Sequence, residues 1–479
     1  MKLEIKNYVA GQWIDGMGAI ENLNPSETSD LVCMIPQGSA KDVERAIEAA
    51  KKGQLEWAKS SLEQRYDVLM NIGQELIRRK EELGHLLSRE EGKPLAEGIG
   101  EIHRSGQFFT YFAAEVLRQM GETAASVRPG VDIQTTREPL GVIGIITPWN
   151  FPMAIPAWKI APALAYGNSV ILKPANQTPA SAHALAEIIH RQNLPAGTFN
   201  LVMGAGREVG EALIHAEGVD GITFTGSVEV GRQIATACAS RMIRCQMEMG
   251  GKNPLLVMDD ADIDVAVQCA VAGGYSGTGQ KCTASSRLVV MRSVMDQFVQ
   301  KLTAKLEEVK VGHALEEGTS MGPVIDQKSR DFILQHIEGA VSEGAVKVTG
   351  GEALELDHKG HYISPCLLVN TTNQMAINRE EIFGPVATVI PVDSYEEGMK
   401  VVNDTSFGLT AGIVTNSLHY STRFNKEAKA GCTMVNLPTA GTDYHVPFGG
   451  RKSSSLGARE MGSYAKEFYT IVKTSYLKA

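Results

Sequence analysis

Three side chains in this sequence have the chemistry of acyl transfer, although they stand far apart along the chain. Cys282 lies in the glycine-rich segment 277–283, where free backbone N–H groups around a thiol would favour a nucleophile. Glu248 stands just before a methionine and two glycines and could act as a general base. Asn150 follows a Thr-Pro-Trp turn, and its amide could donate to a developing oxyanion. The ordinary alternatives are a small buried thiol, a surface carboxylate and a turn-forming asparagine.

Two glycine-rich turns could bind the phosphates of a dinucleotide. The first, 204–210, follows an apolar run and begins a helical one, but its third glycine comes one residue late for the usual fingerprint. No acidic residue is obviously placed ~20 residues further on. The second, 224–231, offers Ser227 as the N-cap of a helix whose free N–H groups suit a pyrophosphate. A tight turn and a plain capped helix remain the alternatives.

Three further loops carry polar residues with weaker individual signals. Lys173 follows an apolar run and could hold ribose hydroxyls or a phosphate, although a solvated loop lysine explains it more simply. The glycine-punctuated segments 380–386 and 447–452, taken singly, are typical of structural loops.

The spacing of apolar residues predicts the elements that position these side chains. Helical periodicity over 40–52 and 62–84 predicts a helical segment 40–120. From residue 140, short apolar strands alternate with helices, which predicts βαβ units and a doubly wound α/β domain. A second α/β lobe is predicted over about 251–445, and a final alternating strand over 468–476 suits a sheet edge or a subunit contact.

The individual elements can be assigned from residue 133 onwards. The predicted strands are 133–137, 142–146, 169–172, 199–203, 221–224, 255–258, 288–290, 387–390 and 411–414. The predicted helices are 179–191, 208–215, 228–239, 262–272, 295–309 and 396–403.

Charge and cysteine usage exclude several function classes. The net charge is −9 at pH 7 and no long basic run occurs, which argues against nucleic acid or an anionic membrane as a partner. The seven cysteines are widely spaced without a C-x-x-C pair, so we expect no disulfide framework and no metal site, in a reduced cytoplasm. The first six residues do not resemble a signal peptide, and 142–172 is interrupted too often for a membrane helix.

Taken together and in this order, the motifs resemble those of the aldehyde dehydrogenase superfamily over nearly the whole chain. The separation of Glu248 and Cys282 also matches that family. The motifs are Trp149-Asn150-Phe151-Pro152, Lys173-Pro174, Phe224-Thr225-Gly226-Ser227, Glu248-x-Gly250-Gly251, Gly279-Gln280-x-Cys282, Glu381-x-Phe383-Gly384-Pro385 and Pro447-Phe448-Gly449-Gly450.

The resemblance implies a division of catalytic labour. Cys282 would be the nucleophile, and Asn150 with the Cys282 backbone N–H would form the oxyanion hole, where each donor is worth ~3–4 kcal/mol. The thiohemiacetal would lose hydride to nicotinamide and leave a thioester. Glu248 would then activate water for hydrolysis to the carboxylic acid. Family members that transfer the acyl group to coenzyme A differ at this position, so Glu248 favours hydrolysis.

The resemblance also implies a nicotinamide dinucleotide site. Lys173 and Glu381 would hold the two riboses, and Phe383 would support the nicotinamide ring. Gly226 and Ser227 would face the pyrophosphate. The other expected cofactor-binding residues are Trp149, Asn176, Met249 and, near the adenine, Gly206.

The choice between NAD and NADP depends on the residue three positions after Lys173. NAD-selective relatives often carry glutamate there, bidentate to the adenosine ribose, and this chain has Asn176. A neutral side chain would not repel a 2′-phosphate, and Lys173 could pair with it. NADP and NAD therefore both fit the sequence.

The family fold implies two domains, an oligomerisation arm and a homo-oligomer. A Rossmann-like dinucleotide-binding domain would comprise 1–117 and 140–250, and an α/β catalytic domain would comprise 251–446. A β oligomerisation arm would comprise 118–139 and 466–479. A homodimer or homotetramer is the expected assembly.

Two segments, 154–159 and 279–287, are similar to bacterial α-ketoglutaric semialdehyde (2,5-dioxovalerate) dehydrogenases. Succinate-semialdehyde dehydrogenases are the main rival. One type of them has two carboxylate-binding arginines where this chain has Trp158 and Ser276, which argues against that rival and leaves a substrate carboxylate without an obvious partner. Arg451 and Arg118 are candidates for that partner.

The expected substrate tunnel has aromatic walls. Phe151 and Trp158 would line it, which suits an unbranched aldehyde. A broad-range aldehyde dehydrogenase is a further alternative.

Two hypotheses from other classes fit the sequence less well. An inactive nucleotide-binding structural protein would not need Cys282, Glu248 and Asn150 together. A cysteine hydrolase or acyltransferase without redox chemistry would leave the nucleotide motifs without a purpose.

Overall fold

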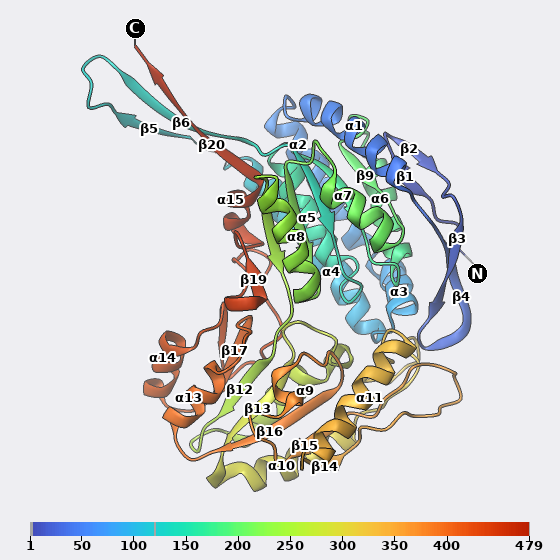
Figure 1. Ribbon diagram of the computed structural model, residues 1–479, viewed down its shortest axis with the longest axis vertical. Helices are drawn as coiled ribbons and strands as arrows, with labels where there is room; N and C mark the ends of the chain where they lie inside the picture. Colours follow the sequence, from blue (N-terminus) through green and yellow to red (C-terminus); the bar gives the residue numbers. More distant parts are fainter. Residues whose placement is uncertain (1–2, 119–120, 479) are drawn as a thin grey trace.

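The computed structural model describes residues 3–118 and 121–478, which form two α/β bodies joined side by side and a narrow β arm (Figure 1). The first body is built on an eight-stranded sheet and the second on a seven-stranded sheet. The chain passes from the first sheet to the second directly after Glu248, so a short loop links the two bodies next to this carboxylate.

The first sheet has the predicted parallel core. Its strand order is β19-β11-β10-β7-β8-β9-β1-β2, in which β11 to β9 are parallel and the outer strands are antiparallel. The strands are β1 (Asn7–Val9), β2 (Gln12–Ile14), β7 (Val142–Ile146), β8 (Ser169–Lys173), β9 (Phe199–Leu201), β10 (Gly221–Thr225), β11 (Arg244–Glu248) and β19 (Ser455–Leu456). Strands β7, β8 and β10 are buried along their whole length, which explains their continuous apolar sequences.

Helices cover both faces of this sheet, as a doubly wound fold requires. Ile143 and Ile145 of β7 pack with one set of helices, and Val142 and Ile146 pack with the other, because successive strand residues point to opposite faces. The first set is α2 (Leu62–Arg78), α3 (Lys80–Glu91), α4 (Leu95–Val116), α5 (Ala154–Ala165) and α6 (Pro179–His190). The second set is α1 (Ala40–Trp57), α7 (Glu211–His215) and α8 (Val228–Ser240).

The second sheet has the order β14-β15-β16-β13-β12-β17-β18, with only β14 antiparallel to its neighbour. Its strands are β12 (Asn253–Val257), β13 (Ser285–Met291), β14 (Val346–Thr349), β15 (Cys366–Val369), β16 (Val386–Val392), β17 (Thr410–Val414) and β18 (Cys432–Val435). Helices α9 (Ile263–Gly274) and α10 (Arg292–Glu307) cover one face, and α13 (Tyr395–Asn403) and α14 (Leu418–Glu427) cover the other. The remaining helices are α11 (Gln327–Ser342), α12 (Ala376–Arg379) and α15 (Lys466–Tyr469).

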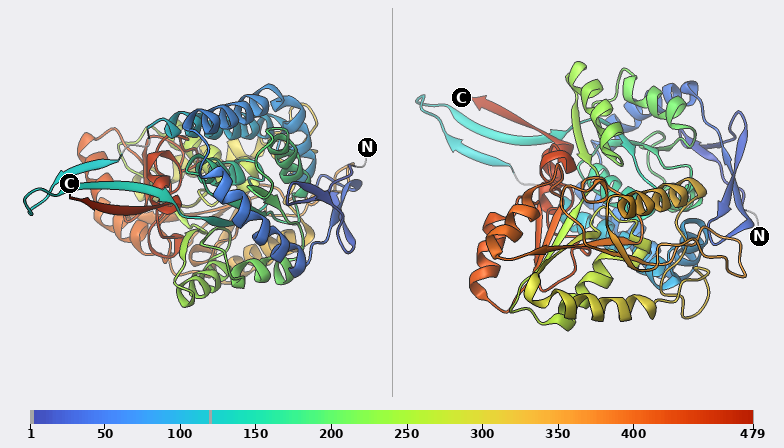
Figure 2. Two further views of the ribbon diagram at one scale, coloured as in Figure 1. Left: turned by 90° about the horizontal axis from the view of Figure 1, so that it is seen from above. Right: turned by 60° about the horizontal axis from the view of Figure 1, so that its bottom comes forward.

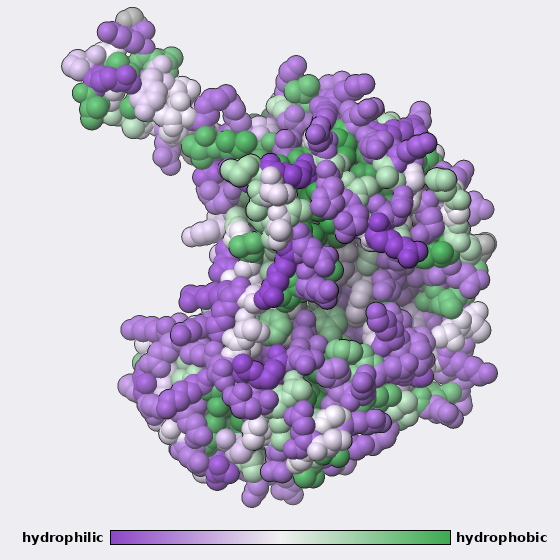
Figure 3. Space-filling model, in the orientation of Figure 1, coloured by the Kyte–Doolittle hydropathy of each residue, from purple (hydrophilic) through white to green (hydrophobic). Residues whose placement is uncertain are grey.

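A three-stranded antiparallel sheet projects away from the first body (Figures 1 and 2). It consists of β5 (Glu122–Ala125), β6 (Asp132–Pro139) and β20 (Thr470–Leu477), with β6 in the middle. The final strand predicted at 468–476 is thereby confirmed, shifted by two residues. Apolar side chains lie among the polar ones on its surface (Figure 3), including the exposed Ile471, Val472, Tyr476 and Leu477.

Two local predictions were wrong, and the N-terminal strands were missed. The helix predicted over 62–84 is two helices, because Arg79 leaves helical geometry and its guanidinium binds Glu75 on one side and Glu82 on the other. The helix predicted over 208–215 begins as a π-helical turn, Gly206–Gly210, before α7. The N-terminal strands β1 and β2 and the hairpin of β3 (Ala19–Asn24) and β4 (Glu27–Pro36) were not predicted.

Membrane insertion by a helix has no support in the described ranges. None of the helices within 3–118 and 121–478 combines the length and the apolar composition that a bilayer crossing requires.

Candidate active site

A cavity of about 270 Å³ lies where the carboxyl ends of β7, β10 and β11 meet the loop that carries Cys282. Loops at this end of parallel strands are the usual ligand-binding position in such sheets. The cavity brings together many of the expected site residues: Trp149, Asn150, Gly226, Ser227, Met249, Cys282, Glu381 and Phe383. Glu248, Lys173, Asn176, Gly206, Phe151 and Trp158 are outside its immediate lining.

The Cys282 loop is held in a special backbone conformation. Gly277, Thr278 and Gly279 all have positive φ, and a Cβ on Gly279 would lie 2.1 Å from the Gly384 carbonyl oxygen. Glycine is therefore required at Gly279. Asn253 Nδ2 donates to the Cys282 carbonyl at 2.7 Å, which fixes the nucleophile candidate at the start of the second sheet.

The Cys282 thiol is partly exposed to the cavity. Its burial in the protein, and then the carboxylates of Glu381 and Glu248, raise its pKa well above the usual thiol value. The thiol is therefore protonated in this arrangement, and its activation requires a base that removes the proton.

Asn150 lies directly beside this loop. Its Nδ2 donates to the carbonyl of Gln280 at 2.9 Å, so one amide hydrogen fastens the two loops and the second remains for another acceptor. The predicted pairing of Asn150 with the Cys282 loop is thus present as a contact.

Glu248 is a buried carboxylate with one free oxygen. Its side chain ends β11 and is 2% exposed. Oε2 accepts from Ser455 Oγ at 2.7 Å, whereas no donor to Oε1 is present within residues 3–118 and 121–478. Burial, and then the nearby Glu460, raise the pKa of Glu248 well above its usual value. Such a carboxylate is suited to accept and hold a proton.

A buried ion pair behind Glu248 was not predicted from the sequence. Lys159 of α5 is fully buried, pairs with Glu460 and donates to Thr223 Oγ1 at 2.8 Å. Glu460 raises the pKa of Glu248, and Lys159 lowers it. The sequence could have indicated that Lys159 is buried and paired, because it is a single lysine in an apolar helix and a buried lysine needs a partner. No sequence pattern identifies Glu460 as that partner.

One side of the cavity combines a carboxylate with two perpendicular rings. Glu381 Oε1 accepts from the Gly251 backbone N–H at 2.8 Å, and burial raises its pKa to about 7. Trp149 and Phe383 stand edge to face with ring centroids 5.6 Å apart, and Phe383 has a positive φ of 58°.

The turn before α8 leaves its backbone open to a ligand. A Cβ on Gly226 would lie 2.5 Å from the Phe224 ring, so only glycine fits there. Ser227 is the N-cap, as predicted, and its side chain accepts from Val230 N at 3.4 Å.

Lys173, Asn176 and Gly206 lie around the carboxyl end of β8 and the start of the π-helical turn. Burial lowers the pKa of Lys173 to about 8. Asn176 Oδ1 is buried with no partner in the described ranges, and a Cβ on Gly206 would meet open space. This set fits the hydroxyl and phosphate groups of a nicotinamide dinucleotide, because it offers one cation, one free acceptor and room.

Aromatic side chains belong to the same hydrophobic cluster against which Cys282 packs. Trp158 stands between Phe108 and Phe448, with centroids 5.8 Å and 6.1 Å away, and Phe151 lies under the ammonium of Lys93 at 4.2 Å. A Cβ on Gly449, next to Phe448, would lie 2.7 Å from Glu248 Oε1. The aromatic group therefore adjoins the candidate base.

The two arginines suggested as carboxylate partners lie elsewhere. Arg118 pairs with Glu115 at 2.8 Å near the base of the arm. Arg451 is exposed, and its backbone N–H binds the Gly408 carbonyl. A third arginine, Arg104 of α4, stands over the Tyr444 ring with its guanidinium 5.4 Å from the centroid.

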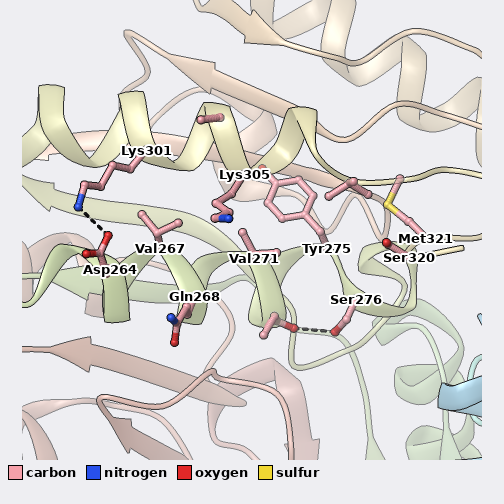
Figure 4. A pocket seen from close by; sticks show the side chains of 13 residues that line it. Asp264, Val267, Gln268, Val271, Tyr275, Ser276, Lys301, Lys305, Ser320 and Met321 are labelled. Atoms are coloured by element: carbon pink, nitrogen blue, oxygen red, sulfur yellow. Dashed lines mark hydrogen bonds and ion pairs between the residues drawn. The ribbon is translucent and has the colours of Figure 1, made fainter. Parts of the chain in front are cut away.

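A larger hollow of about 810 Å³ lies between α9 and α10 (Figure 4). Several of its polar groups have partners: Lys301 pairs with Asp264 at 2.6 Å, and Ser276 Oγ donates to the Ala272 carbonyl. None of the expected site residues lines it, so the smaller cavity is the better candidate site.

The chain is similar to known proteins over almost its whole length. The model of the aldehyde dehydrogenase family matches residues 13–475. An α-ketoglutaric semialdehyde dehydrogenase of Bacillus subtilis (strain 168) is 40% identical over 476 residues, covering 98% of each chain. A succinate-semialdehyde dehydrogenase [NADP(+)] of Escherichia coli (strain K12) is 36% identical over 467 residues, 97% of this chain and 96% of that protein.

A solved structure extends the likeness to three dimensions. Betaine aldehyde dehydrogenase from Staphylococcus aureus in complex with NAD+ has a TM-score of 0.97 at 32% identity, covering 99% of this chain and 95% of that one. The predicted α/β fold and the predicted resemblance to semialdehyde dehydrogenases are confirmed. With a family match over almost its entire length, this chain belongs to the aldehyde dehydrogenase family.

Proposed function

We propose that this chain oxidises a semialdehyde, such as α-ketoglutaric semialdehyde, to the carboxylic acid with NADP or NAD. The observation that carries the proposal is the placement of Cys282 in one cavity with Asn150, next to the buried Glu248. The relative from Bacillus subtilis supports the semialdehyde. Succinic semialdehyde and a broad range of aldehydes are the alternative substrates.

Catalysis begins with a proton transfer and an addition. The Cys282 thiol loses its proton to solvent, and the thiolate adds to the aldehyde carbon. Glu248, whose Oε1 has no donor within the described residues, acts in the second half of the reaction. The second Asn150 N–H and the Cys282 backbone N–H stabilise the resulting oxyanion, at ~3–4 kcal/mol for each donor. Glu381 and Phe383 would hold the nicotinamide nucleotide, which would supply the acceptor for the hydride that leaves this carbon.

The second half of the reaction is hydrolysis. Cys282 now carries the acyl group as a thioester, and Glu248 removes a proton from the attacking water. The same oxyanion donors act again, and the acid leaves as Cys282 regains a proton. Lys159 and Glu460 behind the base adjust its affinity for that proton.

For the cofactor, we assign Lys173 and Asn176 to the adenosine ribose, Glu381 to the nicotinamide ribose and Phe383 to the ring. Gly206, Gly226, Ser227, Trp149 and Met249 complete the proposed site. Asn176 Oδ1 supports the first assignment, because it is a buried acceptor still lacking a donor in the described ranges.

Asn176→Glu is expected to shift selectivity towards NAD. A carboxylate beside Lys173 would repel a 2′-phosphate, and ~2–3 kcal/mol of repulsion corresponds to a loss of kcat/KM with NADP of about 30- to 150-fold. The ratio of kcat/KM for the two nucleotides measures it, with Asn176→Gln as the neutral control. An unchanged ratio would place the 2′-hydroxyl away from Asn176.

Arg104 is our candidate for the carboxylate end of the substrate. It is half-buried beside the Tyr444 ring and one helical turn before Phe108, which contacts Trp158. It forms no salt bridge within the part of the chain that the structure describes. Arg104→Met is expected to raise KM for the semialdehyde about 10- to 100-fold by loss of a charged hydrogen bond.

The control for this prediction removes the same charge elsewhere. Arg118→Met removes the charge of the Arg118–Glu115 pair and should leave KM for the semialdehyde unchanged. Arg104→Met should leave KM for propanal unchanged, because propanal has no carboxylate. An equal loss of activity of Arg104→Met towards propanal would contradict a role in binding the carboxylate.

The domain roles, assembly and location form part of the same proposal. We assign nucleotide binding to 1–117 and 140–250, catalysis to 251–446 and subunit contact to 118–139 and 466–479, of which 1–2, 119–120 and 479 lie outside the described residues. The exposed apolar residues on the projecting arm support a homodimer or homotetramer. Seven free cysteines support a reduced cytoplasm.

The substrate is tested by absorbance of the reduced nucleotide. We expect turnover with 2,5-dioxovalerate to exceed that with succinic semialdehyde and propanal, in parallel assays with NAD and NADP. A preference for another aldehyde would be consistent with the proposed mechanism but would reject 2,5-dioxovalerate as the substrate. No turnover with any aldehyde would reject the proposed aldehyde dehydrogenase activity.

A further inference from the structure

Helix α4 contacts both loops of the active site through two carboxylates one turn apart. Glu97 Oε1 accepts from the backbone N–H of Gly277, at the start of the Cys282 loop, at 3.1 Å. Glu101 Oε1 accepts from the N–H groups of Met153 and Ala154 at 2.9 Å and 3.1 Å. Because α5 has no side-chain cap of its own, Glu101 supplies that cap.

A buried lysine completes this contact on the Asn150 side. Lys93 is 4% exposed, and its ammonium donates to Glu101 Oε2 and to the Asn150 carbonyl oxygen, both at 2.7 Å. It also lies 4.2 Å from the centre of the Phe151 ring. One cation therefore touches the main chain of the oxyanion candidate and the tunnel residue that follows it.

The backbone around Lys93 leaves this side chain little freedom. Gly92 ends α3 with a positive φ of 96°, and Gly322 packs so close that a Cβ there would lie 1.8 Å from the Gly92 carbonyl. Glu91 Oε2 accepts the Lys93 backbone N–H at 2.9 Å. The ammonium is thus fixed in place before any ligand binds.

The position of Lys93 determines that of the Asn150 amide. With its carbonyl held by Lys93, Asn150 directs Nδ2 to the Gln280 carbonyl at 2.9 Å. Gln280 is itself held, because its Oε1 accepts from Ile325 N at 3.0 Å. Loss of the ammonium would leave a buried carbonyl and a buried carboxylate unpaired, and the 150–154 segment would shift to satisfy them.

We propose that Lys93 is a positioning residue for catalysis, which holds the Asn150 amide in register with Cys282. It does so through the Asn150 carbonyl and, through Glu101, the first turn of α5. The inference rests on the proposed role of Asn150 as an oxyanion donor.

The test compares two reactions of Cys282 that need no cofactor. In acylation by 4-nitrophenyl acetate, the thiolate attacks the ester carbonyl, an oxyanion forms, and 4-nitrophenolate leaves behind an acetyl thioester. In alkylation by iodoacetamide, sulfur forms a bond to carbon and iodide leaves, without an oxyanion. Only the first reaction requires a placed Asn150 amide.

Lys93→Met is expected to slow acylation about 10²-fold, the usual effect of a lost oxyanion donor. Alkylation should change by no more than about twofold, because the thiol and its loop are unaffected. Equal slowing of both reactions would overturn the proposal, since it would indicate general disorder of the loop. No change in acylation would overturn it as well.

Arg65→Met is the matched control for loss of a buried cation. Arg65 is 6% exposed and donates to the carbonyls of Ala58 and, at the far end of α5, Ala165. We expect it to lower thermal stability while leaving acylation unchanged. If Lys93→Met does not fold, Glu101→Gln replaces it, with the same selective loss of acylation at smaller amplitude.

Asn150→Ala separates the two proposals. If Asn150→Ala slows acylation and Lys93→Met does not, only the positioning role fails. If Asn150→Ala leaves acylation unchanged, the oxyanion role in the proposed function fails first.

Discussion

Cys282→Ala is expected to lower aldehyde oxidation by at least about 10³-fold, because no covalent intermediate can form without the thiol. Nucleotide binding should persist, since Cys282 is one residue among many in the cavity lining. Steady-state absorbance of the reduced nucleotide measures the loss, and quenching of Trp149 fluorescence measures binding.

Cys432→Ala is the matched control. Cys432 is a partly exposed thiol near the site, and Glu248 is among the groups that raise its pKa. We expect this variant to retain wild-type turnover. Residual turnover in Cys282→Ala comparable with the wild type would show that another group forms the bond to substrate.

Glu248→Gln is expected to stop the cycle after the first half. The amide keeps the size of the side chain and a contact to Ser455 but cannot remove a proton from water. Steady-state turnover should fall about 10²- to 10⁴-fold, the usual contribution of a general base. Stopped-flow absorbance should still show an initial burst of reduced nucleotide that approaches one per site.

Two outcomes of the same experiment would contradict this role of Glu248. A slow reaction without a burst would place the main role of Glu248 before hydride transfer, in removal of the Cys282 proton. A burst followed by unimpaired turnover would remove Glu248 from the mechanism.

The pH profile tests the same carboxylate independently. Burial, and then Glu460, raise the pKa of Glu248, so the base form accumulates only as pH rises through that raised value. Wild-type turnover should therefore increase with pH as Glu248 loses its proton, over a range above that of an ordinary carboxyl group. Lys159 lowers the pKa of Glu248, so Lys159→Met should move this rise to higher pH. A profile that does not move would exclude Lys159 from this role.

The parallel strands were predictable from sequence because they are buried on both faces. The strand predicted at 142–146 is the observed β7, and 221–224 differs from β10 by one residue. Short continuous apolar runs between turn residues identify such strands locally. The hairpin β3–β4 lacks this signal, because β3 has neither a continuous apolar run nor a regular alternation of polar and apolar residues, and it is mostly exposed.

The candidate site was predictable only as separate motifs and a family resemblance. Cys282, Glu248 and Asn150 each stood out by residue type next to glycine or proline. The contacts that orient them join residues remote in the sequence: Lys159 pairs with Glu460, and Lys93 binds Asn150. No periodicity or spacing records such pairs, because they arise only when the helices and loops pack together.

Acyl transfer to Cys282 is tested most directly by locating the acyl group itself. Glu248→Gln is incubated with 2,5-dioxovalerate and NADP, quenched in acid and examined by mass spectrometry of its peptides. We predict a thioester on the peptide that contains Cys282, in an amount equal to the burst of reduced nucleotide. Reduced nucleotide formed without an adduct, or an adduct on another cysteine, would contradict Cys282 as the catalytic nucleophile.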